Sequence, residues 1–92
     1  MRDSQNKALM RAFAAELKAR RSFLEISQEE LAHRCGLNRT FIAKVEIAST
    51  QPSLSVLLRI AEGVGVPLPE LLIATLARYR RELKAELAKR SR

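Results

Sequence analysis

The 92-residue chain is poor in the residue types on which catalytic sites, metal sites and disulfide bonds depend. It has three glycines, one cysteine, Cys35, and one histidine, His33. A lone cysteine excludes a disulfide within the chain, and one histidine with one cysteine is too small a set to hold a metal ion. No Ser-His-Asp set or phosphate-binding glycine loop is present either. We therefore expect no enzyme activity, cofactor or metal, and we expect Cys35 to be a small core residue.

Long apolar runs are also missing. No stretch approaches the roughly 18 uninterrupted apolar residues of a membrane span, and the first seven residues, MRDSQNK, are polar. We expect a soluble protein that is not exported and works in the cytoplasm. A chain of 92 residues is one domain with a limited core, for which a partner subunit would be useful.

Acidic residues are too few to balance the basic ones, so the formal net charge is +7. Such a charge favours a polyanionic partner. The excess is uneven, however, because residues 78–92 hold seven Arg or Lys and two Glu, whereas the three basic residues of 28–51 are balanced by three Glu. Net charge alone therefore supports nucleic acid binding only weakly.

The apolar residues recur at the three- and four-residue spacing of helices, which predicts an all-α fold. We expect five helices, over about 7–23, 27–35, 38–46, 54–62 and 69–90. Ser27, Asn38 and Ser53 are suitable N-caps, and Glu30 stands where its carboxylate could complete a capping box with Ser27. Gly63 and Gly65 are expected to end the fourth helix.

The segment 27–52 has the pattern of a helix-turn-helix. Gly36 tolerates the left-handed backbone of a sharp turn, and Leu37, Ile42 and Val45 would hold both helices to one core. The side chains left facing outward lie near the start of the second helix, where a recognition helix meets base edges. They are Asn38, Arg39, Thr40, Ala43 and Lys44.

The run SQEELAHRCGLNRTFIAKVE resembles the helix-turn-helix of the Cro/phage-repressor (Xre-like) family of bacterial DNA-binding proteins. With NRTF opening its recognition helix, it is most similar to the controller proteins of restriction-modification systems. The resemblance extends from about Phe13 to Leu72. It implies a lambda-repressor-like domain of five helices that binds double-stranded DNA.

The resemblance and the chemistry of the side chains together suggest roles on DNA. Arg39 has a planar fork that can bond guanine O6 and N7, Thr40 can bond a base or pack on a thymine methyl, and Ala43 leaves room for such a methyl. Lys44 suits a phosphate. The expected base contacts are Asn38, Arg39, Thr40 and Ala43, and the expected backbone contacts are Gln28, Arg34, Lys44, Ser49, Thr50 and Gln51. The resemblance also implies that Gln28 braces the recognition helix and that Phe41 packs in the core.

The chain departs from the family pattern at two places. Glu25 stands where the family commonly has a glycine, which leaves open whether that turn needs a positive φ. Ile47 and Ala48 replace the basic residue and glycine that end the recognition helix, so we expect that helix to run a little further. On the polar face of the first helix, Arg11, Lys18, Arg20 and Arg21 are expected to be solvated charges, with a phosphate contact as the alternative near the end of the helix.

The fifth helix is unusually long, and we divide the chain into a DNA-binding domain, 1–74, and an extension, 75–92. An apolar stripe follows this helix, formed by Leu72, Leu76, Tyr79, Leu83 and Leu87. Because an exposed leucine stripe needs a partner, we expect a dimer interface, either antiparallel or a coiled coil. The alternatives are a basic tail on nucleic acid and a surface helix folded back on the domain.

These patterns predict a sequence-specific transcriptional regulator that binds a near-palindromic operator as a homodimer. RNA polymerase is a further candidate partner, which the bound dimer would block or recruit. An antitoxin or phage-type repressor on the same fold remains an alternative. So does a protein-interaction module without DNA binding.

Overall fold

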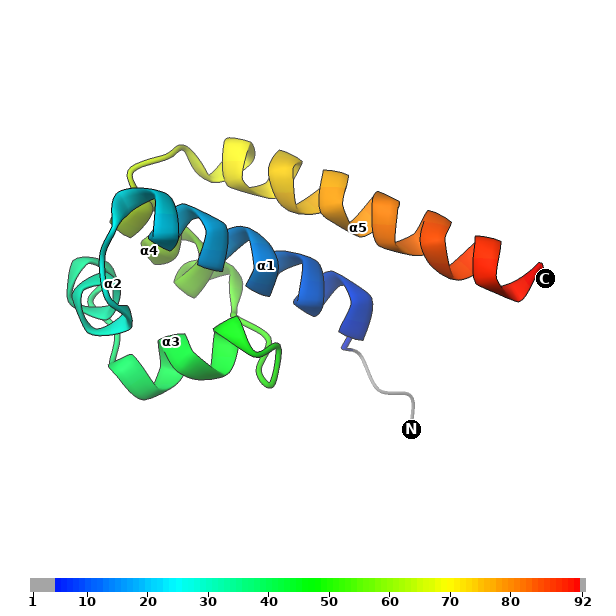
Figure 1. The fold of residues 1–92 in the computed structure, drawn as a ribbon. Helices are drawn as coiled ribbons and strands as arrows, with labels where there is room; N and C mark the ends of the chain where they lie inside the picture. The colour runs from blue at the N-terminus through cyan, green and yellow to red at the C-terminus, as the bar shows by residue number, and fades with distance from the viewer. Residues whose placement is uncertain (1–4, 92) are drawn as a thin grey trace.

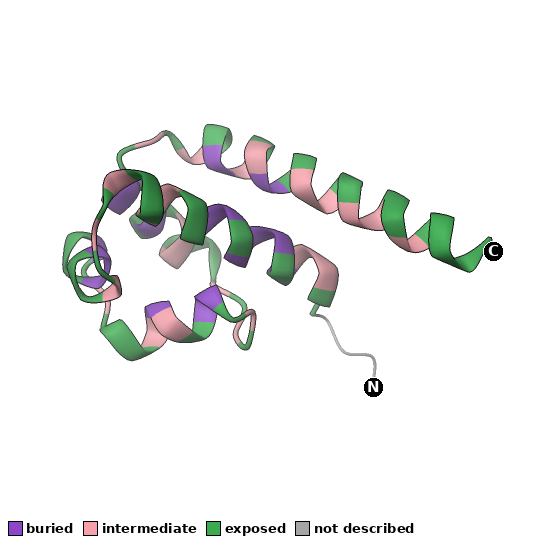
Figure 2. Ribbon diagram, viewed as in Figure 1, coloured by how far each residue is buried: buried purple, intermediate pink, exposed green. Residues whose placement is uncertain are grey.

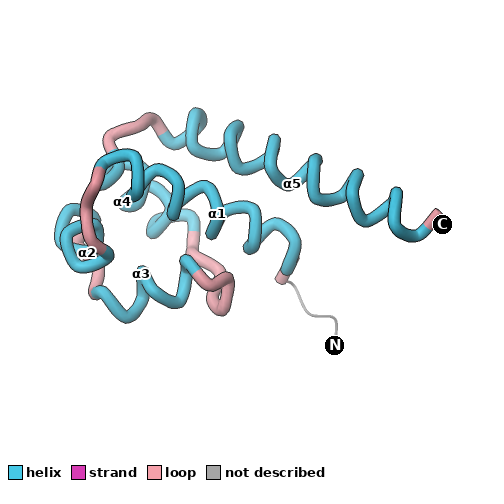
Figure 3. Tube along the Cα trace, viewed as in Figure 1, coloured by secondary structure: helices cyan, strands magenta, loops and turns pink. Residues whose placement is uncertain are grey.

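Five helices and no strand make up the fold over residues 5–91, which the computed structural model describes (Figures 1 and 3). The predicted all-α, five-helix fold is confirmed. Residues 1–4 and 92, at the outer ends of the predicted segments 1–74 and 75–92, lie outside the described part. The helices are α1 (Lys7–Leu24), α2 (Gln28–Cys35), α3 (Arg39–Glu46), α4 (Leu54–Val64) and α5 (Leu68–Arg90).

Helix α1 is the centre of the arrangement, because it contacts α3, α4 and α5. In Figure 1, α5 runs along one side of α1 and α3 lies on its other side, while the end of α5 extends past the start of α1. Helix α2 packs against both α3 and α4. The recognition helix and the long C-terminal helix are thus separated by α1.

The helices begin where the capping residues predict. The side chains of Ser27, Asn38 and Ser53 accept hydrogen bonds from backbone N–H groups three residues later, at 3.0, 2.8 and 3.2 Å. These bonds satisfy donors that a helix start otherwise leaves without a partner. The capping box is only half formed, since the carboxylate of Glu30 accepts instead from Arg34, at 3.3 Å.

A left-handed residue ends α1, α2 and α4, and another lies two residues after α3. Gly36 ends α2 with φ 67°, as predicted. Glu25 ends α1 with φ 57°, so this turn uses a positive φ although the chain has no glycine there. Ala48 has φ 58°, and α3 ends at Glu46. The prediction of a longer α3 is therefore wrong, because the chain makes the turn without glycine.

The core lies where α1, α2, α3 and α4 meet the start of α5, and each of these helices contributes buried apolar residues to it (Figure 2). Cys35 is buried and Phe41 packs at the edge of the core, both as expected, and His33 is exposed. Ile73 is the exception, because 70% of it is exposed although its place early in α5 suggests that it would help close the domain. Leu71 closes it instead, with no exposed surface.

Gly63 lies inside α4 and does not end it. Helix α4 runs two residues past the predicted end, to Val64, and Gly65 with φ 76° caps it. Gly63 is buried against α2, where an added Cβ atom would overlap the Sγ atom of Cys35. The prediction that Gly63 breaks the helix is wrong, because the glycine serves the close approach of α4 to α2.

We expect Gly63→Ala to destabilise the fold, by about 1–3 kcal/mol, because the added methyl group overlaps the buried Cys35 sulfur. Cys35→Ala should relieve part of this loss, since the Cα and backbone N of residue 35 remain within 3.4 Å of the new Cβ. Denaturant unfolding of both single variants and the double variant measures the coupling between them. Strictly additive effects would show that the two residues do not compete for space.

Candidate nucleic-acid interface

The outer face of α3 carries most of the side chains predicted to touch bases. Asn38, Arg39 and Thr40 are exposed at the start of the helix, and Ala43 is half-buried one turn later. The side chain of Asn38 accepts from the N–H of Phe41, so it also caps the helix. Asn38, Arg39 and Thr40 therefore lie together at the start of α3, which is where a recognition helix meets base edges, and Ala43 lies one turn further along.

The residues predicted to touch the DNA backbone come from three neighbouring segments. Lys44 is exposed on α3, and the loop after α3 presents exposed Ser49 and Gln51 with half-buried Thr50. The hydroxyl of Ser49 donates to the carbonyl of Lys44 at 3.2 Å, which holds the loop against the end of α3. Arg34 is exposed on α2 beside Glu30. Such an exposed pair contributes little to stability, so the guanidinium can exchange its partner.

A buried carboxylate, that of Glu46, holds the inner face of α3. Only 3% of Glu46 is exposed. The guanidinium of Arg21 on α1 donates to both carboxylate oxygens, at 2.7 and 2.9 Å, and the side-chain amide of Gln28 on α2 donates at 3.0 Å. Arg21 also donates to the carbonyl of Ile26 at 3.1 Å. This cluster of Arg21, Gln28 and Glu46 joins three helices through charge-assisted hydrogen bonds.

The charged form of Glu46 is favoured despite its burial. Burial by itself would raise the pKa of this carboxyl group. The hydrogen bonds from Arg21 and Gln28, with the positive charges of Arg21 and Lys18, outweigh burial, so the pKa lies below its ordinary value of 4.5. Glu46 is therefore ionised at neutral pH.

The basic residues of α1 are mostly engaged within the protein. Arg11 pairs with Glu82 of α5 at 2.6 Å, Arg20 with Glu16 at 2.7 Å, and Arg21 with Glu46. The prediction of solvated charges is wrong for Arg20 and Arg21, which are half-buried because acidic side chains of a neighbouring turn and of α3 lie within reach. Arg11 remains exposed, as expected, although it forms an ion pair. Lys18 is exposed, as expected.

The sequence interpretation missed Glu46, although a signal was present. Ile42, Val45 and Glu46 follow the spacing of one helical face, so a helix that buries the first two also turns Glu46 inward. A buried carboxylate requires a cationic partner. The bond from Gln28 to Glu46 confirms that this glutamine braces the recognition helix.

The stripe predicted for the dimer interface lies on α5, away from α3. Leu72, Tyr79 and Leu83 are half-buried, whereas Leu76 and Leu87 are exposed by 38% and 63%. The amide of Asn6 donates to the hydroxyl of Tyr79 at 3.0 Å. The stripe is thus partly covered along α1 and open toward the end of α5. Over the described residues, no helix combines the length and apolar character needed to cross a bilayer.

Comparison with known proteins gives a consistent result. Residues 17–71 match the Helix-turn-helix family. The chain is 36% identical over 59 residues to the control protein C.SmaI of Serratia marcescens, a match that covers 64% of this chain and 70% of that protein. It is 43% identical over 47 residues to a hypothetical transcription factor of Neisseria meningitidis, covering 51% of this chain and 44% of that protein.

Solved structures share the fold. The restriction-modification controller protein C.AhdI of Aeromonas hydrophila is 31% identical, with a TM-score of 0.68 over 71% of this chain and 94% of that chain. Two other structures, at 25% identity or less, support the fold alone. The gene regulator ClgR of Corynebacterium glutamicum has a TM-score of 0.81 at 19% identity over 90% of this chain and 88% of its own. The controller C.Esp1396I, in a tetramer bound to its 35-base-pair operator, has a TM-score of 0.72 at 24% identity, over 77% of this chain and 93% of that chain.

The lowered pKa of Glu46 predicts a pH-dependent loss of stability. A carboxyl group whose pKa falls on folding stabilises the protein above its unfolded pKa, and this contribution is lost as the pH drops through the folded pKa. The free energy of unfolding should therefore fall below about pH 4.5. Glu46→Gln should flatten this fall and lower stability at pH 7 by about 1–3 kcal/mol, because Arg21 loses its counter-charge.

Denaturant unfolding at several pH values measures both effects. Glu29→Gln is the matched control, because Glu29 is exposed on α2 and lies outside the Arg21, Gln28 and Glu46 cluster. Its unfolding should keep the pH dependence of the unchanged protein. An identical acid slope for the Glu46 variant and the control would contradict the assigned role of Glu46.

Proposed function

Since this chain belongs to the Helix-turn-helix family and is a DNA-binding transcriptional regulator, we propose that it acts as a homodimer on a near-palindromic operator. The observation that carries the proposal is α3 itself. Its outer face presents Arg39 and Thr40 to solvent, while the buried cluster around Glu46 holds its inner face. A recognition helix held in this way meets the base edges of a major groove in one orientation.

The base-contacting role is proposed for Asn38, Arg39, Thr40 and Ala43. Arg39 is exposed and, within the described residues, forms no ion pair, so its two-pronged donor is available to guanine. Thr40 and Ala43 supply the methyl groups that suit thymine. Phosphate contacts are proposed for Gln28, Arg34, Lys44, Ser49, Thr50 and Gln51, which surround α3 and would set its register on the duplex.

Two copies related by a two-fold axis would place their recognition helices in successive major grooves, roughly 34 Å apart. The contact between the copies is assigned to the α5 stripe of Leu72, Leu76, Tyr79, Leu83 and Leu87. Its exposed leucines would otherwise remain in water. The dimer would act by occupying its operator, and thereby block RNA polymerase or recruit it.

The regulatory role proposed for this dimer is that of a restriction-modification controller in the cytoplasm. The 36% identity to the control protein C.SmaI and the 31% identity to the controller C.AhdI support it. The NRTF opening of α3 is the local feature that resembles the same group of proteins. A controller of this kind would regulate its own gene and the timing of a neighbouring restriction gene.

Selection of bound sequences from a random duplex pool tests the proposed function. At about 150 mM salt, contacts made only by long-range charge are largely screened, so enrichment reports base contacts. We expect an inverted repeat whose half-sites lie about one helical turn apart. A folded protein that enriches no sequence would overturn the proposal in favour of an interaction module without DNA binding.

Two substitutions on the selected operator separate base reading from phosphate binding. Arg39→Ala should weaken binding by about 1–3 kcal/mol and relax the base preference at one position of each half-site. Lys44→Ala should weaken binding to all sequences alike and reduce the salt slope by about 0.9 for each phosphate that is no longer neutralised. Titration by fluorescence anisotropy at several salt concentrations measures both changes.

Arg80→Ala is the matched control, because it removes one exposed positive charge from α5, away from α3. It should leave the base preference unchanged. If Arg39→Ala alters binding no more than Arg80→Ala does, Arg39 is not a base-reading residue.

A further inference from the structure

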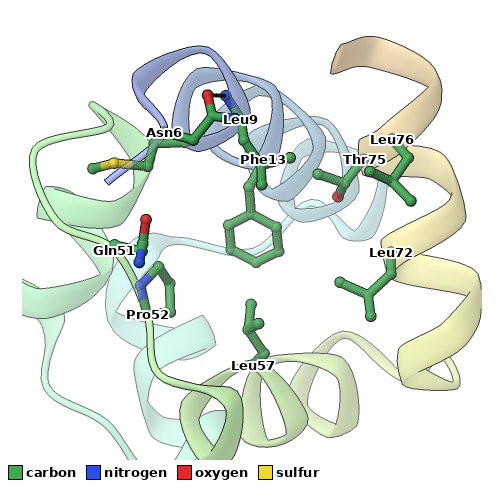
Figure 4. A pocket seen from close by; sticks show the side chains of 10 residues that line it. Asn6, Leu9, Phe13, Gln51, Pro52, Leu57, Leu72, Thr75 and Leu76 are labelled. Carbon is green, nitrogen blue, oxygen red and sulfur yellow. Dashed lines mark hydrogen bonds between the residues drawn. The ribbon is translucent and has the colours of Figure 1, made fainter. Parts of the chain in front are cut away.

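An open apolar cavity lies between α1, α4, α5 and the loop that follows α3 (Figure 4). Its volume is about 420 Å³. For comparison, a cavity of roughly 150 Å³ results when one large side chain is removed from a protein core. The space therefore suits more than one side chain. The walls include Leu9 and Phe13 of α1, Leu57 of α4, Leu72 and Leu76 of α5, and Gln51 and Pro52 of the loop.

The cavity is continuous with the α5 stripe, because Leu72 and Leu76 belong to both. Further along the stripe, Leu83 is half-buried and Leu87 is 63% exposed. Neither of them lines the cavity. The first half of α5 thus lines an apolar hollow, and its second half carries the exposed Leu87 and the partly exposed Leu83. A surface with a hollow and a matching projection can pair with a copy of itself.

The spacing of the stripe is nearly symmetric about Tyr79. Leu76 precedes Tyr79 by three residues and Leu83 follows it by four, while Leu72 precedes it by seven and Leu87 follows it by eight. We propose that two copies pair through α5 in antiparallel orientation, so that the second copy's Leu83 and Leu87 enter the cavity beside Leu76 and Leu72. This inference rests on the proposed homodimer and decides its orientation and register.

Charge favours the antiparallel orientation over a parallel one. Residues 68–77 contain one charged side chain, Glu70, whereas residues 78–90 contain six basic and two acidic side chains, a net charge of +4. A parallel pair would bring the two +4 halves together. An antiparallel pair places each beside the partner's weakly acidic half, and it also opposes the two helix dipoles.

The direction of the stripe suits two recognition helices on one duplex. Leu71 and Thr75 of α5 are buried, and Arg78 and Glu82 form ion pairs with α1. Each of these four residues comes one position before a stripe residue. Because an α-helix turns about 100° per residue, the stripe lies about 100° around α5 from the side that faces α1. Helices α5, α1 and α3 follow one another in this order across the molecule (Figure 1). A two-fold axis along that direction would bring the second copy alongside and place both α3 helices at the same end.

The pairing would also support the loop that is proposed to bind phosphate. Gln51 and Pro52 form one wall of the cavity, opposite Leu72 and Leu76 (Figure 4). Leucines of the second copy that fill the cavity would pack against this wall. The backbone contact of one copy would then depend on α5 of the other, which links dimer formation to DNA binding.

Disulfide cross-linking of the full chain tests the register. In the double variant Leu72→Cys/Leu87→Cys, the two cysteines of one helix are roughly 22 Å apart, too far for a bond within the chain. Cys35 does not compete, because it is buried and burial raises the pKa of its thiol to about 11. On oxidation at pH 8, the double variant should shift from 10.4 kDa to twice that mass on a non-reducing gel.

Neither single variant should form this product, because the two copies of residue 72, or of residue 87, lie at opposite ends of an antiparallel pair. The matched control is Leu54→Cys/Leu87→Cys, since Leu54 is 73% exposed on α4 but lies outside the stripe and the cavity. A covalent dimer of Leu87→Cys alone would overturn the antiparallel orientation. Equal yields from the double variant and the control would overturn the register.

Sedimentation and operator binding of the unchanged chain separate this inference from the proposed function. A dimer that binds an enriched inverted repeat, with no preferred link between residues 72 and 87, would overturn the register and leave the proposed function intact. A chain that stays monomeric and enriches no sequence would overturn both.

Discussion

The orientation of α3 depends on the burial of one carboxylate, that of Glu46. Removing an ionised carboxylate from water is unfavourable unless hydrogen bonds and an opposite charge replace the water. Arg21 of α1 and Gln28 of α2 supply both, and the planar guanidinium restricts direction as well as distance. A recognition helix of eight residues needs such support, since an isolated helix of that length is not stable in water. The backbone of α3 is then ordered before any partner binds, which reduces the entropy that binding would cost.

Features set by local chemistry were predictable from the sequence, whereas features set by distant contacts were not. The caps at Ser27 and Asn38 and the turn at Gly36 follow from interactions within a few residues of the chain. Gly63 differs, because its role is visible only once α4 meets Cys35 of α2. The partners of Arg11 and Arg21 likewise became evident only with the packing of α1 against α5 and α3. The pair of Arg20 with Glu16 is different, because the two residues are four apart on one helix, a spacing that the sequence shows. At the two left-handed residues with side chains, the surrounding structure holds a backbone that residue type alone does not indicate.

The proposed base contacts could be named from the resemblance and the periodicity together, since outward positions on a short helix are few. The cluster of Arg21, Gln28 and Glu46 that supports them could not be named from the sequence in the same way. Counting the charges of residues 28–51 sets Glu46 against a basic residue, but a count does not distinguish a buried carboxylate from an exposed one. The periodicity that buries Ile42 and Val45 does distinguish it, and a charged residue on an apolar helical face is the signal to follow in similar chains.

Helix α1 connects α3 to α5. Arg21 near its end reaches Glu46 of α3, while Glu16 near its middle binds Arg78 of α5 at 2.8 Å. Burial would raise the pKa of Glu16, but the bonds from Arg78 and Arg20 lower it, so this contact is also ionised at neutral pH. The angle between α3 and α5 is therefore set through one helix, by the apolar core that α1 shares with both and by the ion pairs of Arg21, Glu16 and Arg11 with these two helices. In a dimer formed through α5, that angle would fix the distance between the two recognition helices, and hence the half-site spacing that the dimer accepts.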